Sequence, residues 1–228
     1  MSRFGRSEPF ADRREAGQRL GAVLAGTVAA DGSAFPSGPD VLVLGLARGG
    51  VPVAREVADT LDADLDVLVV RKIGAPGQPE FAMGAIATGG HVVVNDDVPR
   101  RLGVSAAQFD AALARERRIL ADREHRYRAG RGPLQIAGRT VVLVDDGLAT
   151  GASMSVALVA MRSAGAGTLV VAVPTAPADV FDRLRVAGAD MIVAVTTPDP
   201  FHAVGQSYRD FSQVGDDAVL AALTRGRS

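Results

Sequence analysis

The sequence contains no cysteine and no tryptophan among its 228 residues. The absence of cysteine excludes disulfides, a thiolate nucleophile and cysteine-based zinc sites. Histidine is scarce as well, and His91, His125 and His202 lie too far apart in the sequence to form a metal-binding motif. Any metal that the protein binds is therefore expected to have oxygen ligands.

Long apolar runs are also absent. No stretch approaches the roughly 18 apolar residues of a membrane span, and the N-terminal segment lacks the apolar core of a secretory signal, so we expect a cytoplasmic protein. A formal net charge of −1 provides no concentrated positive field, so neither nucleic acid nor membrane is predicted as a partner. With 47% apolar residues, the chain is expected to fold as one globular domain over residues 1–228.

Short apolar runs that alternate with helical patterns predict the fold. Nearly continuous apolar runs of this length are typical of strands buried on both faces of a parallel sheet. The expected strands are residues 41–46, 65–70, 140–144, 168–173 and 191–195, and the expected helices are residues 10–29, 51–61, 152–164 and 178–187. This alternation predicts an α/β protein with a mainly parallel central sheet flanked by helices.

Two stretches interrupt the alternation. Residues 71–94 are rich in glycine and proline and too long for a simple connection between strands, so we expect a mobile lid loop. Residues 105–128 begin with a capping box formed by Ser105 and Gln108 and predict one long inserted helix. Two pairs of opposite charge on this helix have the i,i+4 spacing of ion pairs: Asp122 with Arg126, and Glu124 with Arg128.

The strongest chemical signal follows the expected strand at residues 140–144. Asp145 and Asp146 end this strand and precede a turn into a helix. At the carboxyl edge of a parallel sheet, a helix N-terminus offers unpaired N–H groups to an anion. Five residues are therefore expected to hold a phosphomonoester: Ala149, Thr150, Gly151, Ala152 and Ser153. The two aspartates could accept hydrogen bonds from a vicinal diol or from water on Mg²⁺, so the segment could hold a ribose 5-phosphate at both ends.

A second glycine-rich turn follows the expected strand at residues 41–46. Arg48, Gly49 and Gly50 open the next helix and form a backbone nest suited to an anion. The spacing of the glycines matches neither the dinucleotide-binding motif nor the P-loop. The alternative is a surface arginine on a tight turn.

The 13 residues at positions 141–153, VVLVDDGLATGAS, resemble the phosphoribosyl-diphosphate (PRPP) signature of type I phosphoribosyltransferases. The resemblance implies a type I phosphoribosyltransferase-like fold that binds PRPP with Mg²⁺. It implies that Asp145 and Asp146 contact the ribose 2- and 3-hydroxyls and the metal. It also implies that residues 149–153 bind the 5-phosphate and that residues 48–50 face the leaving diphosphate.

Two positions within this signature distinguish the chain from other members of the family. Gly147 stands where the family usually has an aliphatic residue. Ala149 stands where hypoxanthine-guanine enzymes place an aspartate as the candidate base, whereas the adenine type resembles this chain in having alanine. The loop position of Ala149 therefore provides no acid or base in this chain.

Lysine is nearly absent, since 24 of the 25 basic residues are arginine and only Lys72 is lysine. Arg71 and Lys72 end the second expected strand, at the same edge of the sheet as the two turns. A compact ammonium can follow a moving phosphate, so both residues are predicted to bind PRPP, with a solvated strand end as the alternative. By elimination, Glu80 is the candidate base for the acceptor nitrogen, although it could also be a solvated loop carboxylate or the partner of an arginine. Catalytic roles are thus predicted for Lys72, Asp146 and Glu80.

Residues 196–228 are predicted to form a C-terminal hood and tail. Phe201 or Tyr208 could stack on a planar base there, but packing within the segment is the favoured interpretation. His202 is interpreted as a surface or packed histidine rather than a catalyst. The long helix at residues 105–128 could cover the acceptor pocket or form the interface of a homodimer.

Together these features predict transfer of the 5-phosphoribosyl group of PRPP to an unidentified nitrogen acceptor, with release of diphosphate. One alternative is a regulatory protein of the same fold that senses PRPP or nucleotides without catalysis. Another is a related hydrolase or phosphotransfer protein. A receiver domain is disfavoured because its acidic pair would follow the first strand, whereas here the pair follows a late one.

Overall fold

A five-stranded parallel sheet forms the centre of the computed structural model, which describes residues 8–28, 32–94 and 97–224. The strand order is β2-β1-β6-β7-β8, and each neighbouring pair is parallel. The strands are β1 (Val41–Leu46), β2 (Asp64–Leu68), β6 (Thr140–Val144), β7 (Thr168–Thr175) and β8 (Met191–Thr196). All 6 residues of β1 are buried, as expected for a strand covered on both faces. The predicted α/β class with a mainly parallel sheet is confirmed.

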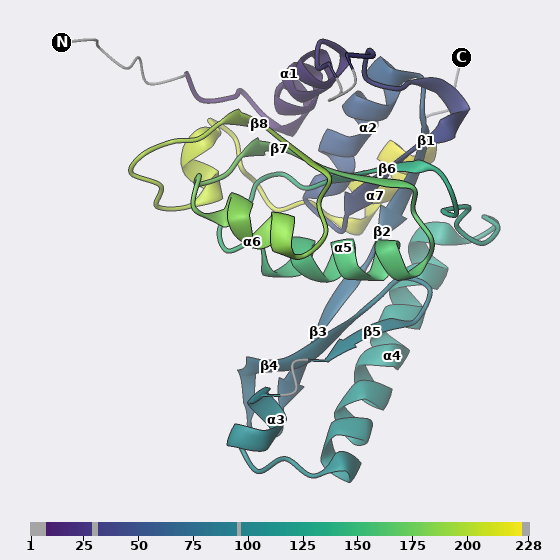
Figure 1. The fold of residues 1–228 in the computed structure, drawn as a ribbon, viewed down its shortest axis with the longest axis vertical. Helices are drawn as coiled ribbons and strands as arrows, with labels where there is room; N and C mark the ends of the chain where they lie inside the picture. The colour runs from purple at the N-terminus through teal and green to yellow at the C-terminus, as the bar shows by residue number, and fades with distance from the viewer. Residues whose placement is uncertain (1–7, 29–31, 95–96, 225–228) are drawn as a thin grey trace.

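Helices cover both faces of this sheet (Figure 1). The first face carries α1 (Arg13–Ala25) and α2 (Gly50–Leu61), whose apolar residues pack against one side of the strands. The second face carries α5 (Ala152–Ser163) and α6 (Val180–Val186), which pack against the other side. Because side chains alternate along a strand, Val43 belongs to the first core and Leu44 to the second. The two layers fix the loops at the carboxyl edge of the sheet.

The first helix is shorter than the pattern over residues 10–29 predicted. The side chain of Asp12 accepts a hydrogen bond from the Glu15 N–H and starts the helix, which ends before Gly26. Leu20 and Leu24 are buried, whereas Val23 is 41% and Val28 is 61% exposed. Only part of the expected apolar stripe therefore faces the core.

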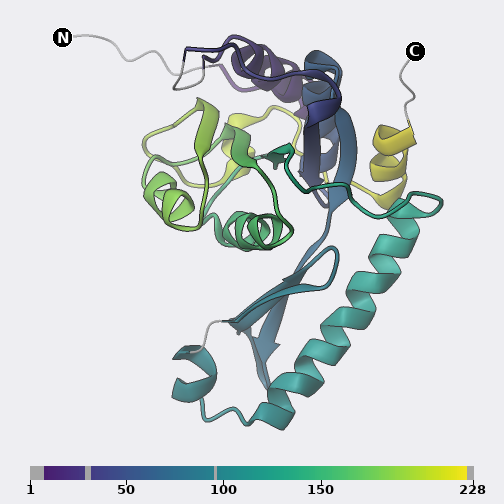
Figure 2. The same ribbon diagram turned by 45° about the vertical axis from the view of Figure 1, so that its right-hand side comes forward.

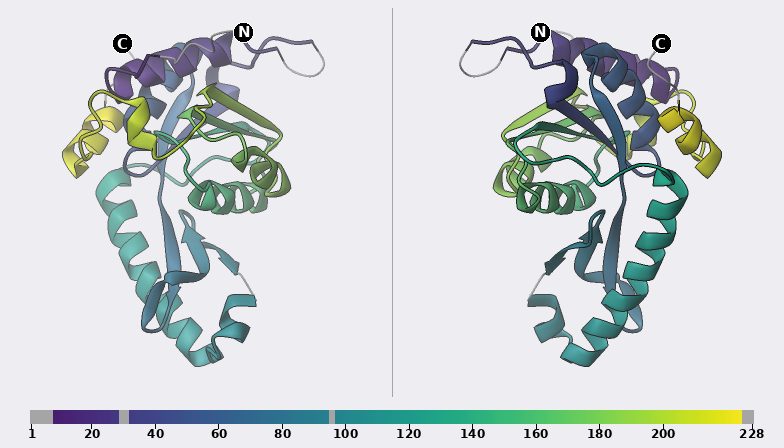
Figure 3. Two further views of the ribbon diagram at one scale, coloured as in Figure 1. Left: turned by 90° about the vertical axis from the view of Figure 1, so that its left-hand side faces the viewer. Right: turned by 90° about the vertical axis from the view of Figure 1, so that its right-hand side faces the viewer.

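A second structural unit, here called the arm, comprises residues 70–94 and 97–128. It contains the antiparallel strands β3 (Val70–Ala75), β4 (Gln78–Ala87) and β5 (His91–Val94), followed by α3 (Asp97–Arg101) and α4 (Ala106–Arg128). Figures 2 and 3 show the arm projecting from the central sheet, with α4 running along the small sheet. A separate apolar cluster that includes Ile73, Met83 and Ala112 holds α4 to this sheet.

The arm corrects two predictions. The segment at residues 71–94 was predicted as a lid loop but forms most of a three-stranded sheet. Its glycines are compatible with strands: Gly77 has a φ of 72° in the turn between β3 and β4, and a side chain at Gly84 would overlap Val93 O. The strand expected at residues 65–70 is also divided, because β2 ends at Leu68 and Val70 begins β3.

The long helix of the arm agrees with its predicted boundaries. Ser105 and Gln108 form both hydrogen bonds of the capping box, and the helix extends to Arg128. The two predicted i,i+4 ion pairs are wrong, because three of their four members have partners outside the helix. Arg126 pairs with Asp216, Arg128 pairs with Asp66, and Glu124 accepts a hydrogen bond from the Gly89 N–H. Long-range contacts therefore replace the local ones.

The C-terminal residues return to the carboxyl edge of the sheet. The short 3₁₀ helix η2 (Val204–Ser207) is followed by a backbone bridge between Phe10 and Tyr208 and then by α7 (Asp216–Thr224). Val219 and Leu223 of α7 pack in a core that also contains Tyr127 of α4. Within the described ranges, no helix combines the length and the apolar character that crossing a membrane requires.

Candidate active site

Two loops meet at the carboxyl edge of the central sheet. We call residues 145–151, between β6 and α5, the aspartate turn, and residues 47–50, from the end of β1 to the first residue of α2, the arginine loop. A Cβ atom at Gly50 would lie 2.5 Å from Val144 O and 2.8 Å from the Asp145 Cα, and a Cβ at Gly49 would overlap Asp146 Oδ2. Glycine at both positions is thus required by the close approach of the loops. The structure brings the predicted diol-binding and diphosphate-binding segments into contact.

The two aspartates have different surroundings. Asp145 Oδ1 accepts a hydrogen bond of 2.9 Å from the Asp146 N–H. Burial raises the pKa of Asp145 well above its ordinary value, and the adjacent charge of Asp146 raises it further. Burial also raises the pKa of Asp146, but the charge and hydrogen bonds of Arg13 oppose this effect. The pair therefore combines one strongly desolvated carboxyl with one that has a cationic partner.

Arg13 is the functional-site neighbour that the sequence did not reveal. Its Nε and Nη2 atoms each lie 2.8 Å from Asp146 Oδ2. The two residues are 133 positions apart, and Arg13 is one of 24 arginines, so no sequence pattern could have identified it. The carboxylate of Asp146 is consequently held from the first helix of the chain.

Tyr208 also contacts the aspartate turn. Its hydroxyl donates a hydrogen bond of 2.5 Å to Asp146 O, and its ring lies between Phe10 and Phe211, with centroid separations of 5.5 and 4.9 Å. Burial raises the pKa of Tyr208, and the charge of Asp146 adds to the effect. Tyr208 is 6% exposed, so its ring is packed, as the favoured interpretation predicted, although Phe10 from the N-terminal part of the chain is one of its partners. His202 is exposed, as expected for a surface histidine.

The aspartate turn leads into the N-terminus of α5. Gly151 has a φ of 69°, and a Cβ there would lie 2.6 Å from Val180 Cγ2, so both the backbone conformation and the packing require glycine. The Arg183 side chain supports the turn by donating a hydrogen bond of 2.7 Å to Thr150 O. Four residues predicted to bind the 5-phosphate are exposed at this helix start: Ala149, Thr150, Ala152 and Ser153. The arrangement offers N–H groups and hydroxyls to an anion.

Gly147, the departure from the family signature, has a structural explanation. A Cβ at this position would overlap Val204 Cγ1 and would lie 2.8 Å from Thr175 Cγ2. Val204 belongs to η2, so the C-terminal segment fills the space beside the turn. An aliphatic residue at position 147 is excluded by this packing.

Arg48 extends from the arginine loop toward α7. Its Nη1 atom lies 3.7 Å from Asp216 Oδ1, and its side chain is 35% exposed. Asp216 also accepts a hydrogen bond of 2.6 Å from the Tyr127 hydroxyl and pairs with Arg126. Hydrogen bonds from Tyr127 and Arg126 lower the pKa of Asp216. The arginine loop is thereby connected to the end of α4.

The remaining predicted residues lie in the arm and not at the end of β2. Arg71 Nε and Nη2 lie 3.1 and 2.8 Å from Glu116 Oε2, so Arg71 is paired with α4. Lys72 is exposed and, because side chains alternate along β3, lies on the opposite face from Arg71. Glu80 belongs to β4, but its side chain lies outside the described part of the structure. Their predicted roles at the site stay predictions, since none of the described hydrogen bonds or ion pairs of Arg71 joins it to the aspartates.

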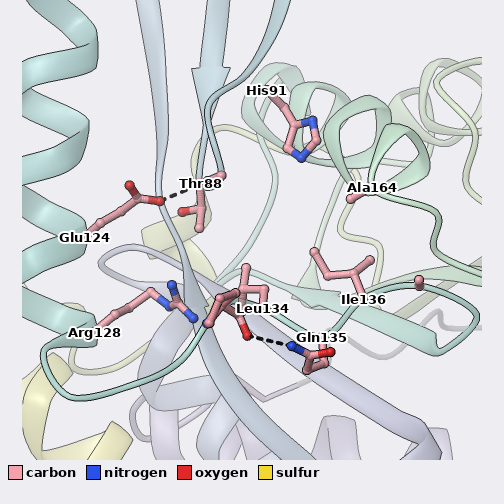
Figure 4. Close-up of a pocket in the computed structure, with 11 residues that line it drawn as sticks. Thr88, His91, Glu124, Arg128, Leu134, Gln135, Ile136 and Ala164 are labelled. Carbon is pink, nitrogen blue, oxygen red and sulfur yellow. Dashed lines mark hydrogen bonds between the residues drawn. The ribbon is translucent and has the colours of Figure 1, made fainter.

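A separate pocket lies between the arm and the start of β6 (Figure 4). It has a volume of about 530 Å³, and His91, Glu124 and Ile136 are among its lining residues. Its wall includes Ala164, just beyond the end of α5, whereas the aspartate turn precedes the start of that helix. None of the predicted PRPP-binding residues lines it, so it is distinct from the candidate site.

Comparisons with known proteins identify the family of the chain. The model of the phosphoribosyl transferase domain family matches residues 30–180. With these residues matched, the chain belongs to the type I phosphoribosyltransferase family, as its signature predicted.

Individual relatives support the assignment. A Mycobacterium tuberculosis protein with the name "Putative phosphoribosyl transferase" is 48% identical over 217 residues, which cover 95% of this chain and 46% of that protein. The chain thus spans about half the length of the curated relatives that it matches. The crystal structure of TT1426 from Thermus thermophilus has 45% identity and a TM-score of 0.78, covering 94% of this chain and 97% of that one. A ribose-phosphate pyrophosphokinase from Methanopyrus kandleri is 45% identical over 74 residues, or 31% of this chain and 25% of that protein.

Proposed function

We propose that the protein transfers the 5-phosphoribosyl group of PRPP to a nitrogen acceptor, such as a nucleobase, and releases diphosphate. The observation that carries this proposal is the contact between the aspartate turn and the arginine loop at one edge of the sheet. Ligands of open parallel sheets bind at this edge, and the two loops provide carboxylates and anion-binding turns side by side.

The aspartate turn is suited to the phosphoribosyl group. The N–H groups and hydroxyls of residues 149–153 would bind the 5-phosphate at the start of α5. The carboxylates of Asp145 and Asp146 would accept hydrogen bonds from the ribose 2- and 3-hydroxyls. Arg48 and the amides of Gly49 and Gly50 would face the leaving diphosphate.

The donor atoms of the site fit a metal that arrives with its substrate. In the described part of the chain, no group of three histidine, aspartate or glutamate side chains could hold a metal ion. Mg²⁺ keeps most of its six ligands as water or substrate oxygens, so Asp145 and Asp146 would suffice to hold it, in part through water. When bound, it would supply neutralising charge for the diphosphate.

In the proposed reaction, the C1–O bond of PRPP breaks through an oxocarbenium-like state and diphosphate leaves with the bonding electron pair. The lone pair of the acceptor nitrogen then forms the new bond to C1. Lys72, exposed on the arm, would follow the diphosphate as a point charge. Glu80 would take the proton from the acceptor nitrogen. Arg71 would act through its ion pair with Glu116, which holds β3 against α4.

Calorimetry with PRPP and Mg²⁺ tests the site. We expect saturable binding by the wild-type protein and a loss of about tenfold or more in affinity for Asp146→Asn, because a hydrogen bond to a charged group contributes about 1.5–3 kcal/mol. Asp182→Asn is the matched control, since the Asp182 side chain is 92% exposed on α6. Absence of PRPP binding under all conditions would contradict both transfer and sensing.

A second experiment separates an enzyme from a sensor. Purified protein would be incubated with PRPP, Mg²⁺ and a panel of purines, pyrimidines and other nitrogen compounds, and diphosphate release would be measured. We expect release that depends on one acceptor class. Tight PRPP binding without release for any acceptor would instead favour the regulatory alternative.

A further inference from the structure

We propose that Arg13 is a positioning residue of the site, which fixes the Asp146 carboxylate against the arginine loop and keeps free divalent cations from the aspartate pair. Its effect on PRPP binding rests on the proposed function, whereas its effect on cation binding does not. The guanidinium of Arg13 would thus serve as a resident counter-ion of the Asp146 carboxylate.

The guanidinium of Arg13 is held on several sides. Nη1 donates a hydrogen bond of 2.8 Å to Ser212 O, while Nε and Nη2 face Asp146. Its carbon atom Cζ lies 4.1 Å from the centroid of the Phe211 ring, within the range of a cation–π contact. The Arg13 side chain is 12% exposed. An arginine with this many contacts is pre-organised rather than free to swing away.

These contacts restrict Asp146. Both nitrogen atoms contact the same oxygen, Oδ2, and Gly49 packs against that oxygen from the arginine loop. The backbone of the same residue is held separately by the Tyr208 hydroxyl. Oδ1 therefore remains as the atom of this carboxylate that can accept a hydrogen bond from a ribose hydroxyl. A carboxylate held in one orientation binds a diol without a further loss of side-chain freedom.

Arg13 also changes which ligands the pair attracts. Two adjacent carboxylates are suitable oxygen ligands for a divalent cation. The permanently charged guanidinium at Oδ2 repels such a cation, whereas it affects a hydrogen bond from a neutral hydroxyl much less. We therefore expect the unliganded wild-type protein to bind free divalent cations weakly, whereas Mg²⁺ that arrives on the anionic diphosphate of PRPP carries less net charge and is repelled less.

The experiment uses Mn²⁺ as the probe in the absence of PRPP, followed by titration of PRPP with Mg²⁺. Arg13→Gln removes the charge, and Arg14→Gln is the matched control because Arg14 is adjacent, is 65% exposed and pairs with Glu56 at 3.5 Å. We expect Arg13→Gln to bind Mn²⁺ about tenfold tighter than the wild-type protein and PRPP about tenfold more weakly. Arg14→Gln should match the wild-type protein in both titrations.

Arg13→Lys provides a second variant that keeps the positive charge and loses the planar fork. It should retain the weak Mn²⁺ binding and still bind PRPP less tightly, since only the orientation of Asp146 is relaxed. The proposal is overturned if the affinity of Arg13→Gln for Mn²⁺ or for PRPP lies within about twofold of the wild-type value. A higher PRPP affinity of this variant would overturn it as well. If wild-type protein binds no PRPP, the proposed function fails, and the Mn²⁺ comparison alone decides the role of Arg13.

Discussion

Replacement of Gly147 by alanine should destabilise the protein through one identifiable clash. The new Cβ would overlap Val204 Cγ1 and would lie 2.8 Å from Thr175 Cγ2. Carbon atoms in good contact are separated by about 3.5–4.0 Å, so the second contact alone is short by about 0.7 Å or more. Overpacking of this kind costs about 1–3 kcal/mol. For a chain of this size, that corresponds to a decrease of about 2–12 °C in the melting temperature.

The displacement caused by the clash should also reach the aspartate turn. Val204 lies in η2 with Ser207, whose hydroxyl is 2.8 Å from the Thr175 hydroxyl, and the next residue, Tyr208, bonds to Asp146 O. If η2 moves to accommodate the Cβ, these two hydrogen bonds weaken. PRPP affinity should therefore decrease together with stability.

Thermal and urea unfolding would measure the effect in Gly147→Ala, Val204→Ala and the double variant. Val204→Ala removes the two methyl groups of Val204 that the new Cβ would meet and leaves the contact with Thr175 Cγ2, so the two substitutions should couple favourably by about 1–2 kcal/mol. Gly215→Ala is the control, because no atom lies within 4 Å of the place that its new Cβ would occupy. If Gly147→Ala is as stable as Gly215→Ala, or Val204→Ala gives no rescue, the packing argument is wrong.

Three further predictions concern the aspartate pair and the arm. Burial raises the pKa of Asp145 in the folded protein above its value of about 3.9 in the unfolded chain. The protonated side chain therefore contributes stability below about pH 3.9, and this contribution is lost as the pH rises through the pKa of the folded protein. Asp145→Asn should therefore raise the unfolding free energy more at neutral pH than near pH 4 while weakening PRPP binding, and equal gains at both pH values would contradict this. Lys72→Ala should lower kcat by about tenfold or more without changing the melting temperature, and Lys72→Arg, which keeps the charge, is the comparison. An unchanged kcat in Lys72→Ala would contradict the proposed role of Lys72. Glu116→Gln should lower the free energy of unfolding of the arm by about 1–3 kcal/mol, because it leaves Arg71 without its charged partner. Amide exchange in β3 should become faster. Unchanged exchange would show that the ion pair does not stabilise the arm.

Local sequence was sufficient to predict the central sheet and the two loops. The strands at residues 41–46 and 140–144 have the predicted bounds, because each is a continuous apolar run that ends in turn residues. The contact between Gly49 and Asp146 also follows from the rule that parallel strands end at one sheet edge. Patterns that are complete within a short segment could thus be interpreted without the structure.

Features that depend on distant partners could not be predicted. Arg71 was predicted to bind PRPP, and its ion pair with Glu116, 45 positions away, was not predicted. The ion pair between Arg13 and Asp146 has no local signature, since helix α1 would form with any polar residue at position 13. The arm was interpreted as a loop because its glycines permit both loops and closely paired strands, and sequence alone does not distinguish these cases.

The small apolar cluster of the arm has a consequence for local unfolding. Its buried residues are Ile73, Ala75, Met83 and Ala112, whereas the central sheet is covered by two much larger clusters. The part of the arm that this cluster holds together buries little apolar surface, so it opens more readily than the central sheet. Amide hydrogens of β3 and β4 should therefore exchange before those of β1 and β6. Because Lys72 belongs to β3, each such opening would release the single lysine of the chain from its fixed position.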